Sequence, residues 1–176
     1  MSSAFAGPEL IKMFKDTFNT HYVAGKCGDN ITALVTRADE RRINLNNANI
    51  LIVSNKGFNT FGMVNVEMAR GALRTGPGPK NWYHHVLLEK DGVIYDYDYT
   101  DSAQVTRTKT YFQNMWLSDK KGVGSAVDYV NPEDKLNDYE VEIIPAYDML
   151  NARRARVKTP EGQKLKLRQY LMSYGR

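Results

Sequence analysis

The sequence predicts an α+β fold in which amino-terminal helices pack on a small antiparallel sheet. Its 176 residues, 42% hydrophobic and 25% charged, are typical of one globular domain with a hydrophobic core. The early part of the chain has the three-to-four-residue periodicity of helices, and two β-rich runs follow on either side of an Asp-Gly pair. Because helices come first and strands follow them, this order favours α+β over a doubly wound sheet.

Two amino-terminal helices are predicted from the spacing of apolar residues. The first begins at Pro8 and has an apolar stripe of Leu10, Ile11, Phe14 and Phe18. The second begins near Cys27 and has a stripe of Ile31, Leu34, Val35 and Ala38. Each helix is therefore expected to bury one face, and Cys27 lies at the amino-terminal end of the second.

The middle of the chain alternates between loops and short strands. Residues 44–49 are rich in asparagine and are expected to form a loop, whereas residues 50–53 are apolar and suit a buried strand. Residues 58–69 fit a helical stripe and a strand alternation equally well, so their structure stays open. Residues 71–80 contain three glycines and two prolines, which indicates a long loop.

A β-hairpin is the clearest structural signal. The runs 82–89 and 93–99 are rich in β-branched and aromatic residues and are separated by Lys90, Asp91 and Gly92. Asp-Gly between such runs favours a tight hairpin turn. Later in the chain we expect a helix over residues 109–117, a strand over residues 139–144, and a last helix that starts at Pro160 with Thr159 as its cap.

Positive charge is concentrated near the carboxyl end. Residues 153–176 hold eight basic side chains and one acidic side chain, Glu161, while the rest of the chain holds 16 basic and 19 acidic ones. We expect a catalytic domain over residues 1–152 and a basic helix over residues 153–176 that packs on it or extends from it. Such a helix is either solvated or binds nucleic acid or an anionic membrane surface. Nucleic-acid binding would weaken steeply with salt and would not respond to thiol alkylation.

Cys27 is the single cysteine of the chain, which excludes an intramolecular disulfide and a zinc site built from several thiolates. Three interpretations remain for its thiol: core filler, incidental thiol, or nucleophile. A metal site that combines Cys27 with histidine and aspartate is disfavoured, since none of the three histidines has a short ligand spacing to it. We therefore expect neither a metal nor another cofactor.

The hairpin register decides which polar side chains share a face. A two-residue turn pairs Lys90 with Val93 and, counted onward, places His85 opposite Asp98 and Leu87 opposite Asp96. His85 then lies on the same face as both aspartates, while a three-residue turn would give them to His84 instead. A carboxylate that holds one ring nitrogen leaves the other for a nucleophile, and Cys27 at a helix start has the electrostatics for that role.

Two stretches of the chain resemble the amino-terminal glutamine amidohydrolases, which belong to the papain-like, transglutaminase-like superfamily of thiol enzymes. Cys27-Gly-Asp29-Asn30 is similar to the family's Cys-x-Glu-Asn. Trp82-Tyr-His-His85-Val-Leu-Leu and Ile94-Tyr-Asp96-Tyr-Asp98 are similar to its Trp-Asp-Tyr-His-Val-Val-Leu and Ile-Tyr-Asp-Leu-Asp. The resemblance implies a papain-like fold, with Cys27 as nucleophile, His85 as base and Asp96 as the residue that orients the base.

The same resemblance implies deamidation of glutamine side chains on a protein or peptide through a thioester. Cysteine peptidases, transglutaminases and toxin or effector domains share these catalytic residues, so they stay as alternatives, and a non-enzymatic nucleic-acid-binding domain is an alternative of another class. Asn30 is a candidate oxyanion donor, and Trp82, His84 and Asp98 are candidate substrate residues. With no leader or membrane span in the sequence, we expect a cytoplasmic protein or one delivered to a target cell by a leaderless route.

Overall fold

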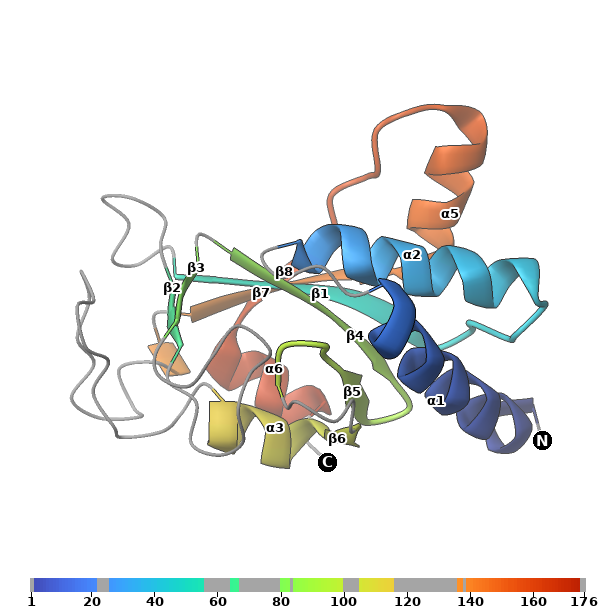
Figure 1. Ribbon diagram of the computed structural model, residues 1–176. Helices are drawn as coiled ribbons and strands as arrows, with labels where there is room; N and C mark the ends of the chain where they lie inside the picture. Colours follow the sequence, from blue (N-terminus) through green and yellow to red (C-terminus); the bar gives the residue numbers. More distant parts are fainter. Residues whose placement is uncertain are drawn as a thin grey trace.

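A six-stranded antiparallel sheet forms the centre of the computed structural model (Figure 1). The structure describes residues 2–21, 26–55, 64–66, 80–82, 84–99, 105–115, 136–137 and 139–174. The strand order is β6-β5-β4-β1-β7-β8. In chain order, these strands are β1 (Ala48–Asn55), β4 (His84–Lys90), β5 (Val93–Tyr95), β6 (Thr106–Arg107), β7 (Tyr139–Pro145) and β8 (Gln163–Lys166). A separate pair is formed by β2 (Val64–Val66) and β3 (Lys80–Trp82).

Both faces of the central sheet are buried, which explains why β1 is apolar at successive positions. Ala48 and Ile50 of β1 belong to one hydrophobic cluster, and Leu51 and Val53 belong to another. Successive side chains of a strand point to opposite faces, so the two clusters are the two sides of the sheet. The mixed helix and antiparallel sheet confirm the α+β class that the sequence predicts.

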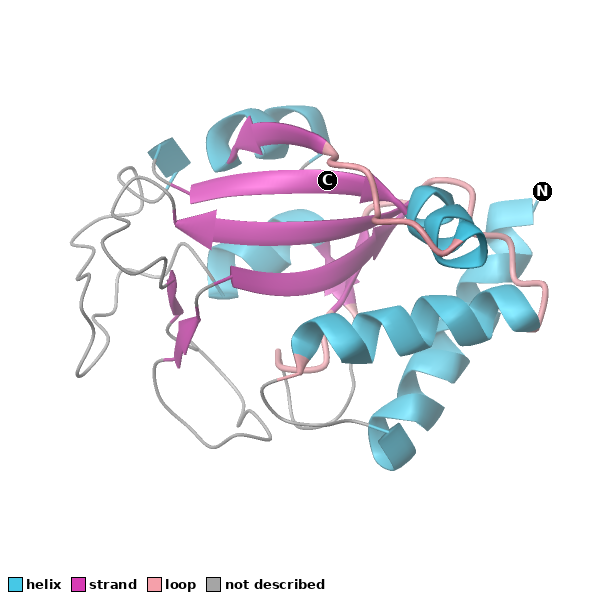
Figure 2. Ribbon diagram, turned by 90° about the horizontal axis from the view of Figure 1, so that it is seen from above, coloured by secondary structure: helices cyan, strands magenta, loops and turns pink. Residues whose placement is uncertain are grey.

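Three helices cover the first face. They are α1 (Ser2–His21), α2 (Cys27–Glu40) and α5 (Ala146–Ala155). The predicted stripe of α2 is confirmed, because Ile31, Leu34, Val35 and Ala38 are all buried. From α1, Leu10 and Phe14 enter the same cluster, and Figure 2 shows α1 crossing α2. The nucleophile candidate Cys27 is thus the first residue of a helix that is fixed to the sheet along its length.

The opposite face is covered by α3 (Thr108–Met115) and α6 (Leu167–Tyr174). Tyr111 and Phe112 of α3 and Leu167 and Tyr170 of α6 are buried against the sheet. In Figure 1 these two helices lie on the other side of the sheet from α2 and α5. The sheet is therefore the middle layer of three. Among the residues that the structure describes, no helix combines the length and apolarity needed to cross a bilayer.

The predicted hairpin is confirmed in its turn but not in its length. Lys90 pairs with Val93 across a two-residue turn, in which Asp91 and Gly92 have the left-handed φ values of 53° and 81°. Such a turn favours Asp-Gly, since glycine carries no Cβ to strain it. The second strand ends at Tyr95, however, and not at Tyr99 as predicted, because the chain turns at residues 97–99.

Two other predicted elements have different boundaries in the structure. The first helix begins at Ser2, and Pro8 lies inside it, although a first-turn position was predicted for this proline. The strand predicted at residues 50–53 extends over Ala48–Asn55, because pairing with β4 and β7 recruits flanking residues that look like loop in isolation. Residues 58–69 and 71–80 lie outside the described residues, apart from β2 and Lys80.

The carboxyl-terminal segment was predicted as one basic helix, and this prediction is wrong. Arg153 belongs to the end of α5, residues 163–166 form β8, and only residues 167–174 are helical. Pro160 therefore does not begin a helix. A close approach requires glycine at position 162, where a Cβ would lie 2.1 Å from the carbonyl oxygen of Ile143. The segment thus adds an edge strand and a covering helix to the main fold.

Candidate active site

The thiol of Cys27 lies where the start of α2 meets β4. Within the described residues, β5 pairs with β4 only at Leu88–Lys90, so β5 does not cover the preceding residues of β4. The helix start fills this position: Cys27 interacts with the backbone of Val86, and a Cβ on Gly28 would lie 3.9 Å from the Val86 side chain. Cys27 is half-buried against the core, and His85 lies near enough to act on the pKa of its thiol.

His85 is fully buried near the beginning of β4, opposite Val53 of β1. It alternates with Val86 and therefore points to the face of the sheet that α3 and α6 cover. Its Nε2 donates a hydrogen bond to Asp96 Oδ2 at 2.9 Å. Because Nε2 is engaged with Asp96, Nδ1 is the ring nitrogen left for the thiol of Cys27, which also acts on the pKa of His85.

Asp96, rather than Asp98, is bonded to the imidazole because the strand ends one residue before it. Strict continuation of the hairpin would have placed Asp98 opposite His85. Instead, the backbone amide of Tyr99 donates to the carbonyl of Asp96 at 3.3 Å, and the amide of Asp98 donates to Asp96 Oδ1 at 2.9 Å. This turn fixes the Asp96 carboxylate, so that its other oxygen accepts from His85.

Tyr111 is the residue of this site that sequence reasoning missed. Its hydroxyl is buried and donates to Asp96 Oδ2 at 2.6 Å, and its ring packs edge-on against Tyr99 and Phe112. The helix that carries Tyr111 was predicted, but its position was not. That position depends on β6, which pairs with β5 and places the start of α3 beside the hairpin. No local pattern signals such a contact.

The electrostatics of the site favour a thiolate beside an imidazolium. Burial by itself raises the pKa of Cys27, but the hydrogen bond and the positive charge of His85, with the Val86 backbone, lower this pKa below its ordinary value. Burial likewise disfavours charge on His85, yet the charge and hydrogen bond of Asp96, together with Cys27, raise the pKa of His85 well above its ordinary value. Both shifts stabilise the ion pair.

The pKa of Asp96 is also shifted, in the direction that keeps its carboxylate ionised beside the His85 imidazolium. Burial would raise it, but His85, the Tyr111 hydroxyl and the Asp98 amide together lower it below its ordinary value. Three donors to one buried carboxylate keep it ionised. Asp98 is also buried, and its negative charge acts on Cys27 in the direction that raises the pKa of the thiol. The two aspartates therefore have opposite effects on the thiolate.

The other predicted site residues lie on three different elements, β4, α2 and β3. His84 is exposed and pairs with Ser54, on the opposite face of β4 from His85. Asn30 is buried on α2, one turn after Cys27. Trp82 ends β3, and its side chain is outside the described part of the structure. The two-residue turn therefore assigns the aspartate contact to His85 and not to His84.

The same residues offer ligand atoms for a metal. One ligand atom each from His85, Asp96 and Asp98 lie within 4.8 Å of one another, and all three residues are buried. A metal bound to His85 Nε2 would replace the proton that now joins this nitrogen to Asp96. The hydrogen-bonded arrangement and a metal-loaded one are therefore mutually exclusive, and a chelator distinguishes them.

Tyr111→Phe is expected to reduce stability by removing one donor to a buried charge. The folded-state pKa of Asp96 is lowered, so its contribution is present above the unfolded pKa and is lost as the pH falls through the folded one. The loss in the free energy of unfolding should be about 1.5–3 kcal/mol at neutral pH and smaller in acid. Urea titrations at both pH values measure it.

Tyr147→Phe is the matched control, since its hydroxyl accepts from the Leu45 amide at 3.1 Å and no carboxylate is involved. Its cost should not decrease in acid. An equal pH dependence of the two variants would contradict the charged contact between Tyr111 and Asp96.

No family model matches the chain, and a search of the curated proteins found no match. A half-buried thiol at a helix start acts on the pKa of a fully buried imidazole, and this imidazole hydrogen-bonds a buried carboxylate. This arrangement has the three groups that nucleophilic catalysis by cysteine requires.

Proposed function

We propose that the chain is a thiol-dependent amidohydrolase that deamidates glutamine side chains on proteins or peptides. The observation that carries the proposal is the grouping of Cys27, His85 and Asp96, in which one ring nitrogen bonds the carboxylate and the thiol and the imidazole act on each other's pKa. A nucleophile-bearing helix beside an antiparallel sheet that carries the base also supports a papain-like fold.

In the first half of the reaction, the Cys27 thiolate attacks the carbonyl carbon of the carboxamide. The carbon–sulfur bond forms as the carbonyl π electrons move to oxygen. The His85 imidazolium then gives its proton to the nitrogen, the carbon–nitrogen bond breaks, and ammonia leaves a thioester behind. Burial of both groups increases the strength of these electrostatic interactions.

In the second half, water hydrolyses the thioester. Neutral His85 accepts a proton from water as the water oxygen bonds to the carbonyl carbon, and the carbon–sulfur bond then breaks. The products are a carboxylic acid, which loses its proton to solvent and becomes a carboxylate, and the restored pair of thiolate and imidazolium. Asp96 stays ionised throughout and holds the ring in its orientation.

The oxyanion that forms in both halves is assigned to the beginning of α2. Lys26 at the N-cap makes no side-chain cap hydrogen bond, and amides of the first turn have no preceding helical carbonyl. Such amides stabilise a negative charge on an oxygen beside the thiol. Asn30 is a further candidate donor because it is buried one turn away.

Glutamine is chosen as the substrate from the resemblance of the two sequence motifs, while the thiol chemistry comes from the geometry. A peptidase would release an amine-terminated peptide by the same steps. A transglutaminase would resolve the thioester with a primary amine instead of water. The group released from the substrate (ammonia or a peptide) and the group that resolves the thioester (water or a primary amine) therefore distinguish these alternatives.

The wild-type protein should release ammonia from glutamine-bearing peptides, and Cys27→Ala should abolish this release because the nucleophile is gone. Mass spectrometry should show a gain of about 1 Da per modified glutamine, as expected when an amide becomes an acid. Circular dichroism should show that the variant keeps its fold, and EDTA should leave the wild-type rate unchanged.

Each other outcome counts against the deamidase. Ammonia release that survives in Cys27→Ala, or that EDTA abolishes, contradicts the thiol mechanism. Cleaved peptides indicate a peptidase, and incorporation of an added primary amine in place of hydrolysis indicates a transglutaminase. Salt-sensitive nucleic-acid binding without turnover favours the non-enzymatic alternative.

The rate should depend on pH as a bell whose limbs belong to the coupled Cys27–His85 pair. The acid limb should lie below the ordinary pKa of a thiol and the alkaline limb above that of a histidine. Asp96→Asn should lower kcat roughly 10⁴-fold and move the alkaline limb to lower pH, because the imidazolium loses its carboxylate.

Asp98→Asn provides the matched comparison two residues away. Since the charge of Asp98 raises the pKa of Cys27, its removal should move the acid limb to lower pH and leave the alkaline limb in place. Identical shifts in the two variants would contradict the separate roles of the two aspartates.

A further inference from the structure

Arginines are concentrated where two helices end that lie far apart in the sequence. Residues 37–42, around the end of α2, and residues 153–156, around the end of α5, hold six of the chain's eleven arginines and only two acidic residues. The sequence alone indicated an excess of positive charge only in residues 153–176. The six arginines are Arg37, Arg41, Arg42, Arg153, Arg154 and Arg156.

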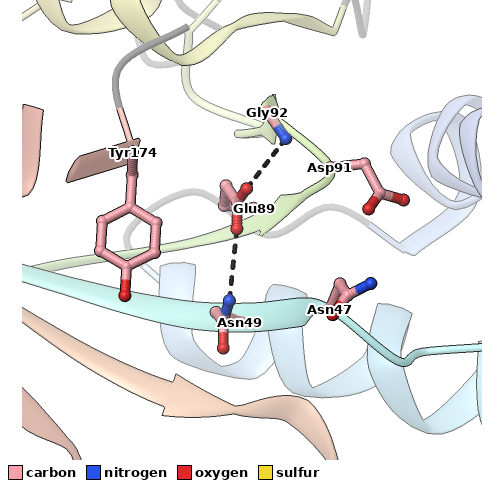
Figure 3. Close-up of a pocket in the computed structure, with 6 residues that line it drawn as sticks. All are labelled: Asn47, Asn49, Glu89, Asp91, Gly92 and Tyr174. Atoms are coloured by element: carbon pink, nitrogen blue, oxygen red, sulfur yellow. Dashed lines mark hydrogen bonds between the residues drawn. The ribbon is translucent and has the colours of Figure 1, made fainter.

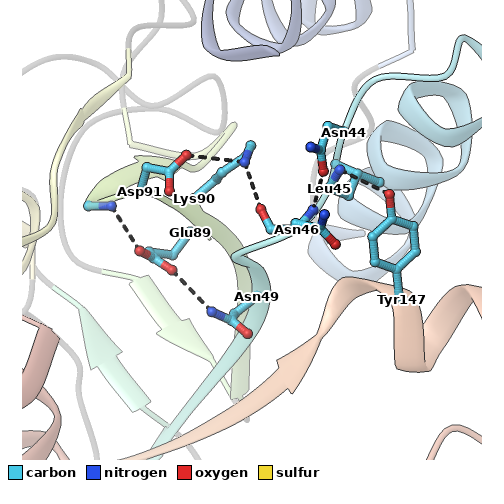
Figure 4. Close-up of polar contacts among 9 residues, drawn as sticks. Asn44, Leu45, Asn46, Asn49, Glu89, Lys90, Asp91 and Tyr147 are labelled. Atoms are coloured by element: carbon cyan, nitrogen blue, oxygen red, sulfur yellow. Dashed lines mark hydrogen bonds and ion pairs between the residues drawn. The ribbon is translucent and has the colours of Figure 1, made fainter. Parts of the chain in front are cut away.

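Two contacts hold these segments together. The Arg154 guanidinium donates to the Asp39 carboxylate, which joins the end of α5 to the end of α2. The hydroxyl of Tyr147, in the first turn of α5, accepts from the amide of Leu45, in the segment that follows α2, at 3.1 Å (Figure 4). The two arginine-bearing segments are therefore neighbours in space.

A groove of about 470 Å³ lies between α2 and α5. Its described lining residues on α2 run from Asp29 to Glu40, at the three- and four-residue spacing of one helix face. Arg153 of α5 also lines the groove. Since the adjacent Arg154 bonds Asp39, Arg153 lies toward the Glu40 end. The groove has the size of a small-molecule site.

Two donors in this lining are unused. The Arg153 side chain is exposed and makes no hydrogen bond or ion pair with the described residues. Thr36 Oγ1 is buried and has no hydrogen-bond partner within the described structure, although a helical threonine can donate to the carbonyl four residues before it. Arg37 also lines the groove and interacts with other groups, among them Tyr97 through its charge. An anion in the groove would thus meet a guanidinium and a hydroxyl that the protein itself does not use.

Helix dipoles explain only some of the arginines. A cation in the last turn of a helix is favoured by the partial negative charge there, and three of the six arginines lie in the last turn of α2 or α5. The other three lie beyond the last helical residues and have no side-chain hydrogen bond or ion pair among the described residues. These are Arg41, Arg42 and Arg156.

The acidic residues of the groove lie at its two ends. Asp29 is in the first turn of α2 and Glu40 is its last residue, roughly 16 Å apart along a helix. Glu40 follows Arg37 at a spacing that brings opposite charges together on a helix. With Arg153 added from α5, the Glu40 end of the groove has more positive than negative side chains in its lining.

The cavity at the hairpin end of β4 has a different character (Figure 3). It has a volume of about 320 Å³, and its described lining includes Glu89 and Asp91 but no cationic residue. Glu89 accepts from the Gly92 amide at 2.9 Å and from Asn49 Nδ2 at 3.4 Å. This second cavity therefore offers no guanidinium to an anion, whereas the groove between α2 and α5 does.

We propose that the groove between α2 and α5 binds a small ligand with two or more phosphate groups. Guanidinium groups pair with phosphate oxygens in a bidentate geometry, and Arg153 and the Thr36 hydroxyl supply donors within the groove. The arginines around its end supply charge for a further phosphate. A small ligand is favoured over a nucleic acid because the unused hydroxyl is buried in the groove and is not on the outer surface. The proposal does not depend on the reaction proposed for the thiol.

Tripolyphosphate is a suitable probe, titrated into the ¹⁵N-labelled full chain. It should shift the amide resonances of Thr36 and Arg153 along a saturating curve. Arg153→Gln should weaken this binding at least ~10-fold, because a charge-assisted contact is lost. Thr36→Val should weaken it several-fold without lowering stability in urea, because the hydroxyl has no partner to lose in the free protein.

Lys166→Gln is the matched control for the loss of one positive charge. Lys166 is exposed on β8, and its ammonium has no ion pair with the described residues, so this variant should bind tripolyphosphate like the wild type. Citrate, a small anion with three carboxylates, should bind more weakly than tripolyphosphate. Equal affinity in the wild type and in Arg153→Gln, equal binding of citrate, or binding of a single-stranded oligonucleotide without a saturating response to tripolyphosphate would overturn the proposal.

Discussion

The contact between the start of α2 and the part of β4 that does not pair with β5 is the constraint on which the site depends. Cys27 can approach His85 because β5 pairs only with the last three residues of β4, so the first turn of α2 occupies the place that a neighbouring strand would otherwise take. The helix is held there by Ile31, Leu34 and Val35, which are buried against the sheet. The packing of α2 along its length thereby fixes the distance between the Cys27 thiol, at the first residue of the helix, and the His85 ring on β4.

The charge distribution follows from the same layered architecture. His85 points to the face that α3 covers, and this burial would remove its charge if Asp96 were absent. Asp96 is itself buried and stays ionised because a turn amide, a tyrosine hydroxyl and the imidazole all donate to it. Three elements distant in sequence, α2, the hairpin and α3, therefore determine the protonation states of one another's side chains.

Sequence patterns predicted those parts of the structure that depend on local chemistry. The stripe of α2 and the Asp-Gly turn follow from periodicity and backbone preference, and they were enough to place Cys27 at a helix start. The choice between His85 and His84 stayed open until the turn was seen to have two residues. Where tertiary pairing decides, local patterns were misleading or silent. Residues 163–166 form a strand because β7 offers them an edge, and β5 stops at Tyr95 because the chain turns there. Tyr111 was missed because its contact with Asp96 spans a segment with no regular periodicity.

The pairing of the Cys27 thiolate with the His85 imidazolium is best tested by a pH titration of the intact protein, in which ultraviolet absorbance reports the thiolate. The chain has a single cysteine, so subtraction of the Cys27→Ala spectrum isolates the signal. We expect a thiolate that forms below the ordinary pKa of a cysteine, and we expect His85→Asn to return that pKa to the ordinary value or above it. A wild-type thiol that ionises only at or above the ordinary value, unchanged by the loss of His85, would contradict the pairing of thiolate and imidazolium.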